Sequence, residues 1–464
     1  MLETEPDLST NLLSETKSLF SHIDFTHGAV AAVSGGSDST ALLLLLKQHL
    51  DRTAPSAKLL AVTVDHGLRQ GSAAEAQAVA KLCAERGIAH HTLVWAGSKP
   101  STGLPAAARE ARYRLLAEAA RAEGIGLIVT GHTADDQAET VLMRHARDEG
   151  REFADMAGRG LAGMAPATLY DWREWIVRPL LRTRRSALRD FLRREHVGWA
   201  DDPTNIDEAF ERPRVRAALA GETVGRIEDV LLLAGQAAVE RRQLGAGAAD
   251  LIHRFASQPA IGLIRLDPAL LTADDDRAAI YALRILLATA GGVAFLPDQA
   301  RGEALFGRLK AGFLCATLSR TVVDFRRAGL FLRREARGLP QAATVADNTV
   351  WDGRRHITLN DRSGALLIAP LGAAAAKRLA IDGGETPASL MRAALAAEPT
   401  SRQALENPGL PQIEPGSPGF AVRPVVSPFA RFLPSFDLAP AQAVAGLIGA
   451  SPLPAPPLRG HSAD

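Results

Sequence analysis

The order of apolar and polar positions is most regular between residues 28 and 180. Short β-branched runs alternate there with longer segments whose apolar residues recur about every 3.6 positions. This alternation is typical of βαβ units and predicts an α/β fold with a doubly wound parallel sheet. The expected strands lie at residues 29–33, 59–64, 91–95 and 125–130, and the helices that follow them at 38–50, 72–86, 105–123 and 133–145. Ligands bind beyond the carboxyl ends of such strands, so the loops at Ser34, Asp65 and Gly131 should face one cleft.

The pattern changes after residue 216. Long Ala/Leu-rich stretches such as 227–244 and 277–290 predict a helical middle domain. Short apolar runs at 322–326, 330–333 and 365–369 predict strands of a small mixed α/β domain. Proline and glycine are frequent from about residue 407 onward, which predicts a loosely attached tail. The predicted domains are residues 1–218, 219–320, 321–406 and 407–464.

Composition narrows the class of protein. With 464 residues, 47% hydrophobic and 23% charged, the chain is expected to be a soluble globular protein of two or three domains. Cys83 and Cys315 form no CxxC pair, which argues against a zinc site, an iron–sulfur site or a disulfide framework and favours a reducing cytoplasm. No basic, apolar leader and no apolar run of roughly 20 residues is present, so export and membrane insertion are not expected. The net charge of +1 does not by itself indicate a nucleic-acid partner.

A glycine- and serine-rich turn, SGGSDS, follows the first expected strand and opens a helix. Its residues are Ser34, Gly35, Gly36, Ser37, Asp38 and Ser39. Glycines allow close backbone approach, serines add hydroxyl donors, and the helix N-terminus attracts anions, so the turn is a candidate phosphate loop. It lacks the lysine of a Walker A loop and is therefore of another type. The alternative is a turn that only joins strand to helix.

Asp38 adds information about the ligand. A carboxylate beside phosphates is repulsive unless a cation lies between them, so Asp38 is predicted to bind Mg²⁺. The alternative role is that of a first-turn carboxylate favoured by the helix dipole.

A second polar cluster, GHTADDQAET at residues 131–140, follows the fourth expected strand. Helical spacing places His132, Asp136 and Glu139 on one face, an arrangement that suits metal or ribose binding. The alternative is a capping box, because Thr133 is followed by Asp136 three residues later.

A strongly basic stretch follows the α/β pattern. Its arginines are Arg178, Arg182, Arg184, Arg185, Arg189, Arg193 and Arg194. Leu188, Phe191 and Leu192 give it an apolar stripe, which predicts an amphipathic helix with a basic surface that binds RNA phosphates. The alternative is a solvated helix face.

Taken together, these motifs resemble those of the tRNA(Ile)-lysidine synthetases, a family of the ATP-pyrophosphatase (PP-loop) enzymes. The resemblance covers residues 28–216 and includes SGGSDS, GHTADDQAET, VDHGLR at 64–69, AREARY at 108–113, RPLL at 178–181 and WADDPTN at 199–205. One departure is Pro213, which stands in RPRVR where the family has asparagine in RNRxR; the backbone and contacts at this position are not predicted. Residues 323–335 and 351–354 resemble the family's C-terminal region only loosely.

The resemblance implies an adenine nucleotide α-hydrolase-like fold, with ATP and Mg²⁺ as cofactors. It implies that Asp38, Arg112, Asp136 and Glu139 are catalytic, with Asp38 and Asp136 holding the metal. The SGGSDS loop, His66 and His132 would bind ATP. The implied contacts with tRNA are Arg182, Arg185, Arg189, Arg193, Arg214 and Arg216.

The implied reaction ligates free L-lysine to C2 of cytidine 34 in the CAU anticodon of tRNA(Ile). O2 of the cytidine attacks the α-phosphorus of ATP, pyrophosphate leaves, and lysine then displaces AMP, which changes codon recognition from AUG to AUA. A cytoplasmic enzyme without a membrane partner is expected, and a homodimer is compatible with the resemblance. Two alternatives stay open: a tRNA thiolase of the same fold, although such enzymes commonly carry paired cysteines, and a non-catalytic RNA-binding relative, although its motifs should be eroded.

Overall fold

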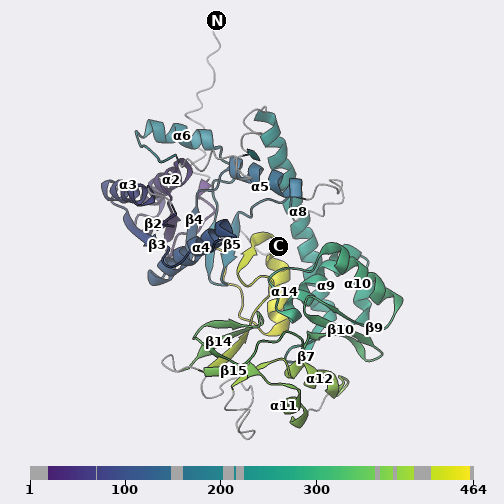
Figure 1. The fold of residues 1–464 in the computed structure, drawn as a ribbon. Helices are drawn as coiled ribbons and strands as arrows, with labels where there is room; N and C mark the ends of the chain where they lie inside the picture. The colour runs from purple at the N-terminus through teal and green to yellow at the C-terminus, as the bar shows by residue number, and fades with distance from the viewer. Residues whose placement is uncertain are drawn as a thin grey trace. The chain divides into compact units, whose positions relative to one another are not determined.

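The computed structural model describes residues 19–68, 71–147, 160–201, 214–215, 224–360, 366–379, 384–401 and 420–459. The chain divides into two compact units, Met1–Arg241 with Pro454–Asp464, and Arg242–Leu453 (Figure 1). The division falls within the long helix α8 (Val224–Phe255). It does not test the domain limits predicted at residues 218, 320 and 406, which stay a prediction.

The first unit is built on a sheet whose strands lie in the order β5-β6-β4-β1-β2-β3. These strands are β1 (Ala29–Ala32), β2 (Leu59–Asp65), β3 (Ala89–Val94), β4 (Leu127–Thr130), β5 (Ala167–Tyr170) and β6 (Glu174–Val177). The pairs from β3 to β6 are parallel. The predicted parallel sheet is therefore confirmed for the first four strands, each within a few residues of its expected position.

The part of this sheet beyond β4 departs from the prediction, because β5 pairs antiparallel with β6. The two strands form a hairpin whose turn contains Asp171 and Trp172 with φ of 53° and 60°. Two consecutive left-handed residues are what a tight hairpin turn requires. Neither residue is glycine, so the turn carries no simple sequence signal and the hairpin was not predicted.

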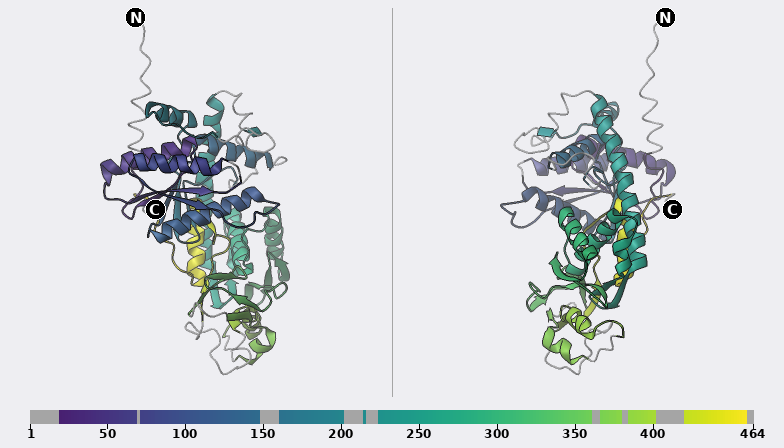
Figure 2. Two further views of the ribbon diagram at one scale, coloured as in Figure 1. Left: turned by 60° about the vertical axis from the view of Figure 1, so that its left-hand side comes forward. Right: turned by 90° about the vertical axis from the view of Figure 1, so that its right-hand side faces the viewer.

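The helices of the first unit follow the strands as expected. They are α2 (Ser37–Thr53), α3 (Ser72–Glu85), α4 (Leu104–Ala122), α5 (Ala134–Arg147) and α6 (Arg185–Arg194). Helix α2 has Asp38 in its first turn and Arg52 in its last, which complements the helix dipole, and its leucine run 42–46 is buried. Helices α2 and α3 cover one face of the sheet and α4 the other (Figure 2), as right-handed crossovers in opposite directions require.

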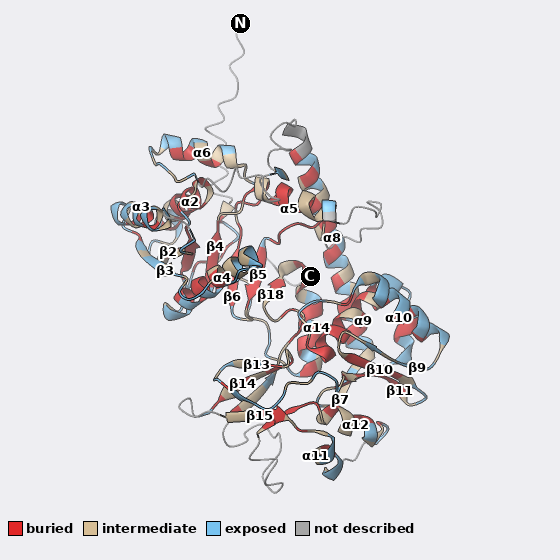
Figure 3. Cartoon of the chain, in the orientation of Figure 1, coloured by how far each residue is buried: buried red, intermediate tan, exposed pale blue. Residues whose placement is uncertain are grey.

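The strand order creates a switch point between β1 and β4. From β1 the chain proceeds to β2 and β3, and then crosses back to β4 on the other side of β1. Ligands bind at such a point because the loops after the two central strands diverge there. The loops in question carry SGGSDS and GHTADD, and both follow strands that are buried along their whole length (Figure 3).

The second unit contains one five-stranded antiparallel sheet, in the order β7-β8-β11-β10-β9, and two three-stranded sheets, β12-β15-β16 and β13-β14-β17. Its strands are β7 (Ala256–Ala260), β8 (Leu263–Leu266), β9 (Leu314–Leu318), β10 (Thr321–Arg326), β11 (Gly329–Arg334), β12 (Ala343–Val345), β13 (Thr349–Trp351), β14 (Arg355–Leu359), β15 (Leu366–Pro370), β16 (Pro399–Ser401), β17 (Phe420–Pro424) and β18 (Phe432–Pro434). Its helices are η2 (Pro268–Thr272), α9 (Asp276–Gly291), α10 (Gln299–Ala311), α11 (Ala373–Arg378), α12 (Ala388–Leu395), η3 (Ser435–Asp437) and α14 (Leu438–Ile448). Strands predicted at 322–326, 330–333 and 365–369 are found as β10, β11 and β15.

Two expectations for this part of the chain are corrected. The region expected to be helical, residues 219–320, also carries β7, β8 and β9. The end of the chain is not a loose tail over residues 420–459, because β17 pairs with β14, Val444 of α14 is fully buried, and Leu458 forms a β-bridge with Ile23 in the first unit. The apolar residues of this segment supply a buried face despite its proline-rich composition.

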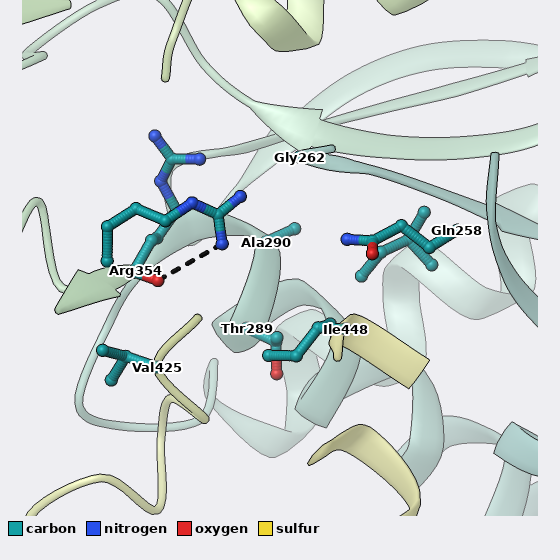
Figure 4. Close-up of a pocket in the computed structure, with 9 residues that line it drawn as sticks. Gln258, Gly262, Thr289, Ala290, Arg354, Val425 and Ile448 are labelled. Atoms are coloured by element: carbon teal, nitrogen blue, oxygen red, sulfur yellow. Dashed lines mark hydrogen bonds between the residues drawn. The ribbon is translucent and has the colours of Figure 1, made fainter. Parts of the chain in front are cut away.

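The second unit also encloses a small cavity lined by Gln258, Thr289, Arg354, Val425 and other residues (Figure 4). Arg354 and Arg355 are both buried and pair with the buried Glu398. The cavity volume of about 20 Å³ is enough for about one water molecule. This volume is far too small for a nucleotide.

Candidate active site

The SGGSDS loop joins β1 to α2 and has the geometry of a phosphate loop. Gly35 has φ of 86°, a conformation that side-chain-bearing residues rarely adopt. Gly36 is the N-cap of α2, so the free backbone N–H groups of the first turn lie at the loop. The loop thereby presents amide donors and the positive end of the helix dipole to one side.

The serines of the loop differ in their roles. Ser39 is buried, and its Oγ accepts a hydrogen bond from the backbone N of Ser34 at 3.1 Å and donates one to Gly36 O at 3.1 Å. Ser39 therefore holds the shape of the turn. Ser34 is exposed at the open side, and Ser37 Oγ donates to Asp38 Oδ1 at 3.0 Å.

The GHTADD loop packs closely against the start of α2. A Cβ atom added to Gly131 would lie 2.9 Å from Asp38 O and 3.1 Å from Ser39 Cα, so only glycine permits this approach. Asp136 Oδ2 accepts from both the backbone N and Oγ1 of Thr133, each at 2.9 Å. The capping box is thus present, and it leaves Asp136 Oδ1 free to point away from the helix end.

The centre of the site is a half-buried arginine among carboxylates. Arg185 Nε donates to Asp38 Oδ2 at 2.8 Å, and Nη2 donates to Asp136 Oδ1 at 3.0 Å. Nη1 lies 3.6 Å from Oε1 of the buried Glu139. We call Asp38, Asp136 and Glu139 the acidic cluster. Burial opposes the charge of Arg185, but Asp136 and Asp38 outweigh it and raise the pKa of its guanidinium.

This position of Arg185 was not expected. The sequence predicts a phosphate contact with tRNA for Arg185, whereas the structure places its guanidinium in the acidic cluster at the nucleotide loop. The predicted carboxylates Asp38, Asp136 and Glu139 are indeed brought together, across a sequence separation of up to 147 residues from the arginine that joins them.

Helix α6 and the segment after it are attached to the phosphate loop at two further points. Arg189 Nε donates to Ser37 Oγ at 3.4 Å, and the backbone N of Ala200 donates to Gly35 O at 2.9 Å. The predicted apolar stripe of α6 is confirmed, because all three of its apolar residues named above are buried. The sequence did not indicate the bond from Ala200, since backbone contacts leave no trace in residue type.

The two predicted histidines line the loops at this end of the sheet. His132 Nδ1 lies 2.9 Å from Thr130 Oγ1. His66 stacks edge-on against Trp95 at 5.9 Å, and no described residue forms a hydrogen bond with its buried Nδ1. Burial, and then the positive charge of Arg112, lower the pKa of His66, so the ring is neutral near pH 7. An unpartnered buried nitrogen is a ready acceptor or donor for a ligand.

The other predicted residues are more dispersed. Arg112 acts electrostatically on His66, and within the described part of the chain it forms no ion pair with the acidic cluster. Arg182, Arg193 and Arg214 are exposed and accessible to a large partner. Arg216, like residues 202–213, lies outside the described residues.

One pair at the site was missed by the sequence analysis. Asp135 Oδ2 accepts from the backbone N of Arg185 at 2.8 Å, and Arg184 Nη2 donates to Asp135 Oδ1 at 3.3 Å. This pair fixes the beginning of α6 beside α5. The sequence signal for this pair was the two successive aspartates, Asp135 and Asp136. Neighbouring side chains on a helix point in different directions, so only one of the two can face the acidic cluster and the other is available for a different partner.

The oxygen donors present suit Mg²⁺. No group of three or more His, Cys, Asp or Glu side chains arranged to hold a metal occurs among the residues described. Mg²⁺ in nucleotide sites needs only one or two carboxylates, with substrate phosphates and water as the other ligands. Asp38 and Asp136 provide those two beside the phosphate loop, and both already face a cation in the form of Arg185.

No helix in the described part of the chain is long and apolar enough to cross a membrane.

Comparison with known proteins agrees with this geometry. The model of the PP-loop domain family matches residues 8–223. A tRNA(Ile)-lysidine synthase of Mesorhizobium japonicum is 85% identical over 464 residues, which cover 100% of both chains. The enzyme of the same name from Brucella canis is 38% identical over 433 residues, 90% of this chain and 94% of the relative.

Among solved structures, a U34-tRNA thiolase from Methanococcus maripaludis matches 49% of this chain and 80% of its own. The identity is 16% and the TM-score 0.40, a likeness too slight to support any conclusion. The identity with the curated relatives over nearly the whole chain is decisive, and the protein belongs to the tRNA(Ile)-lysidine synthase family.

Proposed function

We propose that this enzyme uses ATP to ligate free L-lysine to C2 of cytidine 34 in the CAU anticodon of tRNA(Ile). The proposal depends on one observation. The phosphate loop after β1 and the acidic cluster lie together at the switch point of the sheet. Family membership supports the choice of tRNA and lysine as the other substrates.

In the first step, the loop of residues 34–39 holds the β and γ phosphates through its backbone N–H groups and the start of α2. Asp38 and Asp136 would hold Mg²⁺, which when bound would neutralise the phosphates and stabilise the charge that develops as pyrophosphate leaves. His66 and His132 line the nucleotide site. Arg112 adds a positive charge on the side of His66. O2 of the cytidine attacks the α-phosphorus, and the adenylated base keeps AMP as its leaving group.

In the second step, the amine of lysine attacks C2 and AMP departs. The target cytidine must be unstacked to reach the site, as is usual for enzymes that act on a base. The exposed arginines Arg182, Arg193 and Arg214 contact the tRNA backbone in this proposal, together with the half-buried Arg189. Arg216, outside the described residues, is proposed to do the same. We also propose that the enzyme acts in the cytoplasm. Sedimentation of the full chain would test whether it forms the expected homodimer.

The direct test is ATP-dependent incorporation of labelled lysine into unmodified tRNA(Ile) with a CAU anticodon, with AMP release measured in parallel. Incorporation that requires ATP supports the proposal. AMP release without lysine incorporation would retain the adenylation and exclude lysine as second substrate. Absence of both with a tRNA that binds would overturn the proposal.

Variants of the site sharpen this test. Asp38→Ala and Asp136→Ala should each abolish incorporation and leave tRNA affinity nearly unchanged, because both carboxylates bond Arg185 within the acidic cluster and neither pairs with the exposed Arg182 or Arg193. The matched control is Asp51→Ala, which removes an exposed carboxylate of the same helix α2 that pairs with Lys47 one turn away. Wild-type turnover in either site variant would remove that carboxylate from the mechanism.

A further inference from the structure

Arg185 occupies the position in which a metal ion is needed. Its three nitrogens are directed at the three members of the acidic cluster, at 2.8, 3.0 and 3.6 Å. Its side chain is 18% exposed, and that of Glu139 is 2% exposed. Three carboxylates this close repel one another unless a cation lies between them, so the guanidinium holds the acidic cluster together.

Every carboxylate oxygen of Asp38 and Asp136 already has a partner. Asp38 Oδ1 accepts from Ser37 and Oδ2 from Arg185. Asp136 Oδ2 accepts twice from Thr133, and Oδ1 accepts from Arg185. A carboxylate oxygen can accept more than one partner, but a metal that bridges Asp38 and Asp136 needs the space between them, which the Arg185 guanidinium occupies.

Charge and position indicate which partner of Asp38 and Asp136 the metal displaces. Mg²⁺ requires oxygens at about 2.0–2.1 Å, which is incompatible with an arginine nitrogen bonded in the same place. The bonds from Thr133 belong to the start of α5, and loss of a helix cap costs about 1 kcal/mol. Exchange of one cation for another leaves the acidic cluster neutralised, whereas loss of a hydroxyl donor with Arg185 still in place would bring two cations together.

The attachment of Arg185 allows this exchange. Its backbone N is bonded to Asp135, and the neighbouring Arg184 pairs with the same carboxylate, so the beginning of α6 is fixed. Only the long side chain of Arg185 needs to move. Because α6 also contacts Ser37 through Arg189, a displaced guanidinium stays beside the phosphate loop.

We propose that Arg185 is a positioning residue that serves as the counter-cation of the acidic cluster before nucleotide binds, and that it cedes Asp38 and Asp136 to Mg²⁺ when Mg·ATP arrives. This proposal rests on the proposed Mg²⁺ site. Its consequence is that a divalent cation binds weakly to the free enzyme, because it must first displace the guanidinium. Mg²⁺ then enters together with ATP, whose phosphates supply the remaining ligands and offer the displaced guanidinium a new partner.

The test measures metal binding without nucleotide. Mn²⁺ is the probe, and its binding to the full chain is followed by electron paramagnetic resonance of the free ion. Arg185→Gln should raise the affinity for Mn²⁺ by at least about tenfold, because it removes a charge next to the ligands. Arg185→Lys retains a competing cation and should stay near the wild type.

The matched control is Arg184→Gln. It removes an identical charge one residue away, but its partner Asp135 lies outside the acidic cluster. Its Mn²⁺ affinity should equal that of the wild type. The double variant Arg185→Gln, Asp38→Asn should lose the gained affinity, because the gain depends on the freed carboxylate.

Thermal stability provides a second measurement that does not depend on a strong metal signal. Arg185→Gln leaves three unneutralised carboxylates, so it should lower Tm in EDTA and regain more stability from added Mg²⁺ than the wild type does. Equal Mg²⁺-induced shifts in Tm, together with equal Mn²⁺ affinities of Arg185→Gln and wild type, would overturn the role of Arg185.

The two proposals fail in different ways. If Mn²⁺ binds with ATP and the binding is lost in Asp38→Asn, the metal site stands whatever the result for Arg185→Gln. If Mn²⁺ with ATP binds Asp38→Asn and Asp136→Asn as well as it binds the wild type, the proposed metal site fails, and the proposal for Arg185 falls with it.

Discussion

Gly131 controls the distance between the two loops of the site, and Gly131→Ala is the perturbation that measures it. The added Cβ would lie 2.9 Å from Asp38 O, 3.0 Å from Asp38 C and 3.1 Å from Ser39 Cα. All three are backbone atoms in the first turn of α2, and none can rotate away. The loop before α5 must therefore move away from α2 by several tenths of an ångström.

The expected cost follows from overpacking at a rigid contact, which typically destabilises a protein by about 1–3 kcal/mol. The same movement separates Asp136 from Asp38, which now share the Arg185 guanidinium through bonds of 3.0 and 2.8 Å. Misplacement of catalytic groups by about 1 Å can cost about a hundredfold in rate, so the smaller movement here should lower lysine incorporation by at least about tenfold.

The control is Gly126→Ala, just before β4, where an added Cβ has no neighbour within 4 Å. Such a change at a compatible position is neutral or stabilises by up to about 1 kcal/mol. The assays are urea-induced unfolding and ATP-dependent incorporation of labelled lysine. If Gly131→Ala matched Gly126→Ala in both unfolding midpoint and activity, the close approach of the two loops would have no role in positioning the site.

Three further predictions concern properties outside the acidic cluster. Burial raises the pKa of the Cys83 thiol to about 11, so in native protein at pH 8 iodoacetamide should alkylate the exposed Cys315 and spare Cys83, whereas both should react in denaturant; native labelling of Cys83 would contradict its burial. Burial, and then the charge of Arg52, lower the pKa of His49 below 6.5, so the unfolded state binds the proton more readily and the free energy of unfolding should fall as pH drops below 6.5; His49→Phe should flatten part of this slope in urea titrations, and an unchanged slope would count against it. Arg193→Gln should reduce the slope of log K for tRNA against log salt by about one phosphate contact, whereas Arg114→Gln on α4 should not; equal slopes would exclude Arg193 from the RNA surface.

The sequence alone determined the local elements of the first unit. The four expected strands and the helices after them are found within a few residues of their predicted limits, because each depends on periodicity and on turn residues nearby in the chain. The phosphate loop was identifiable for the same reason: Gly35, Gly36 and Asp38 act within a single turn between a strand and its helix. Asp136 and Glu139 of the second loop could be identified in the same way, from their helical spacing in the sequence.

The tertiary structure decided how these pieces meet. The place of Arg185 depends on α6 packing against α2, and residue type alone equally suits an arginine on an RNA-binding surface. The β5–β6 hairpin contains two non-glycine residues with left-handed backbone conformations, which the sequence does not signal. The ordered C-terminal segment is stabilised by partners distant in the sequence, such as Ile23 and β14. In the site, the bond between Arg185 and Asp38 joins residues 147 positions apart, and only the folded backbone brings their charges within bonding distance.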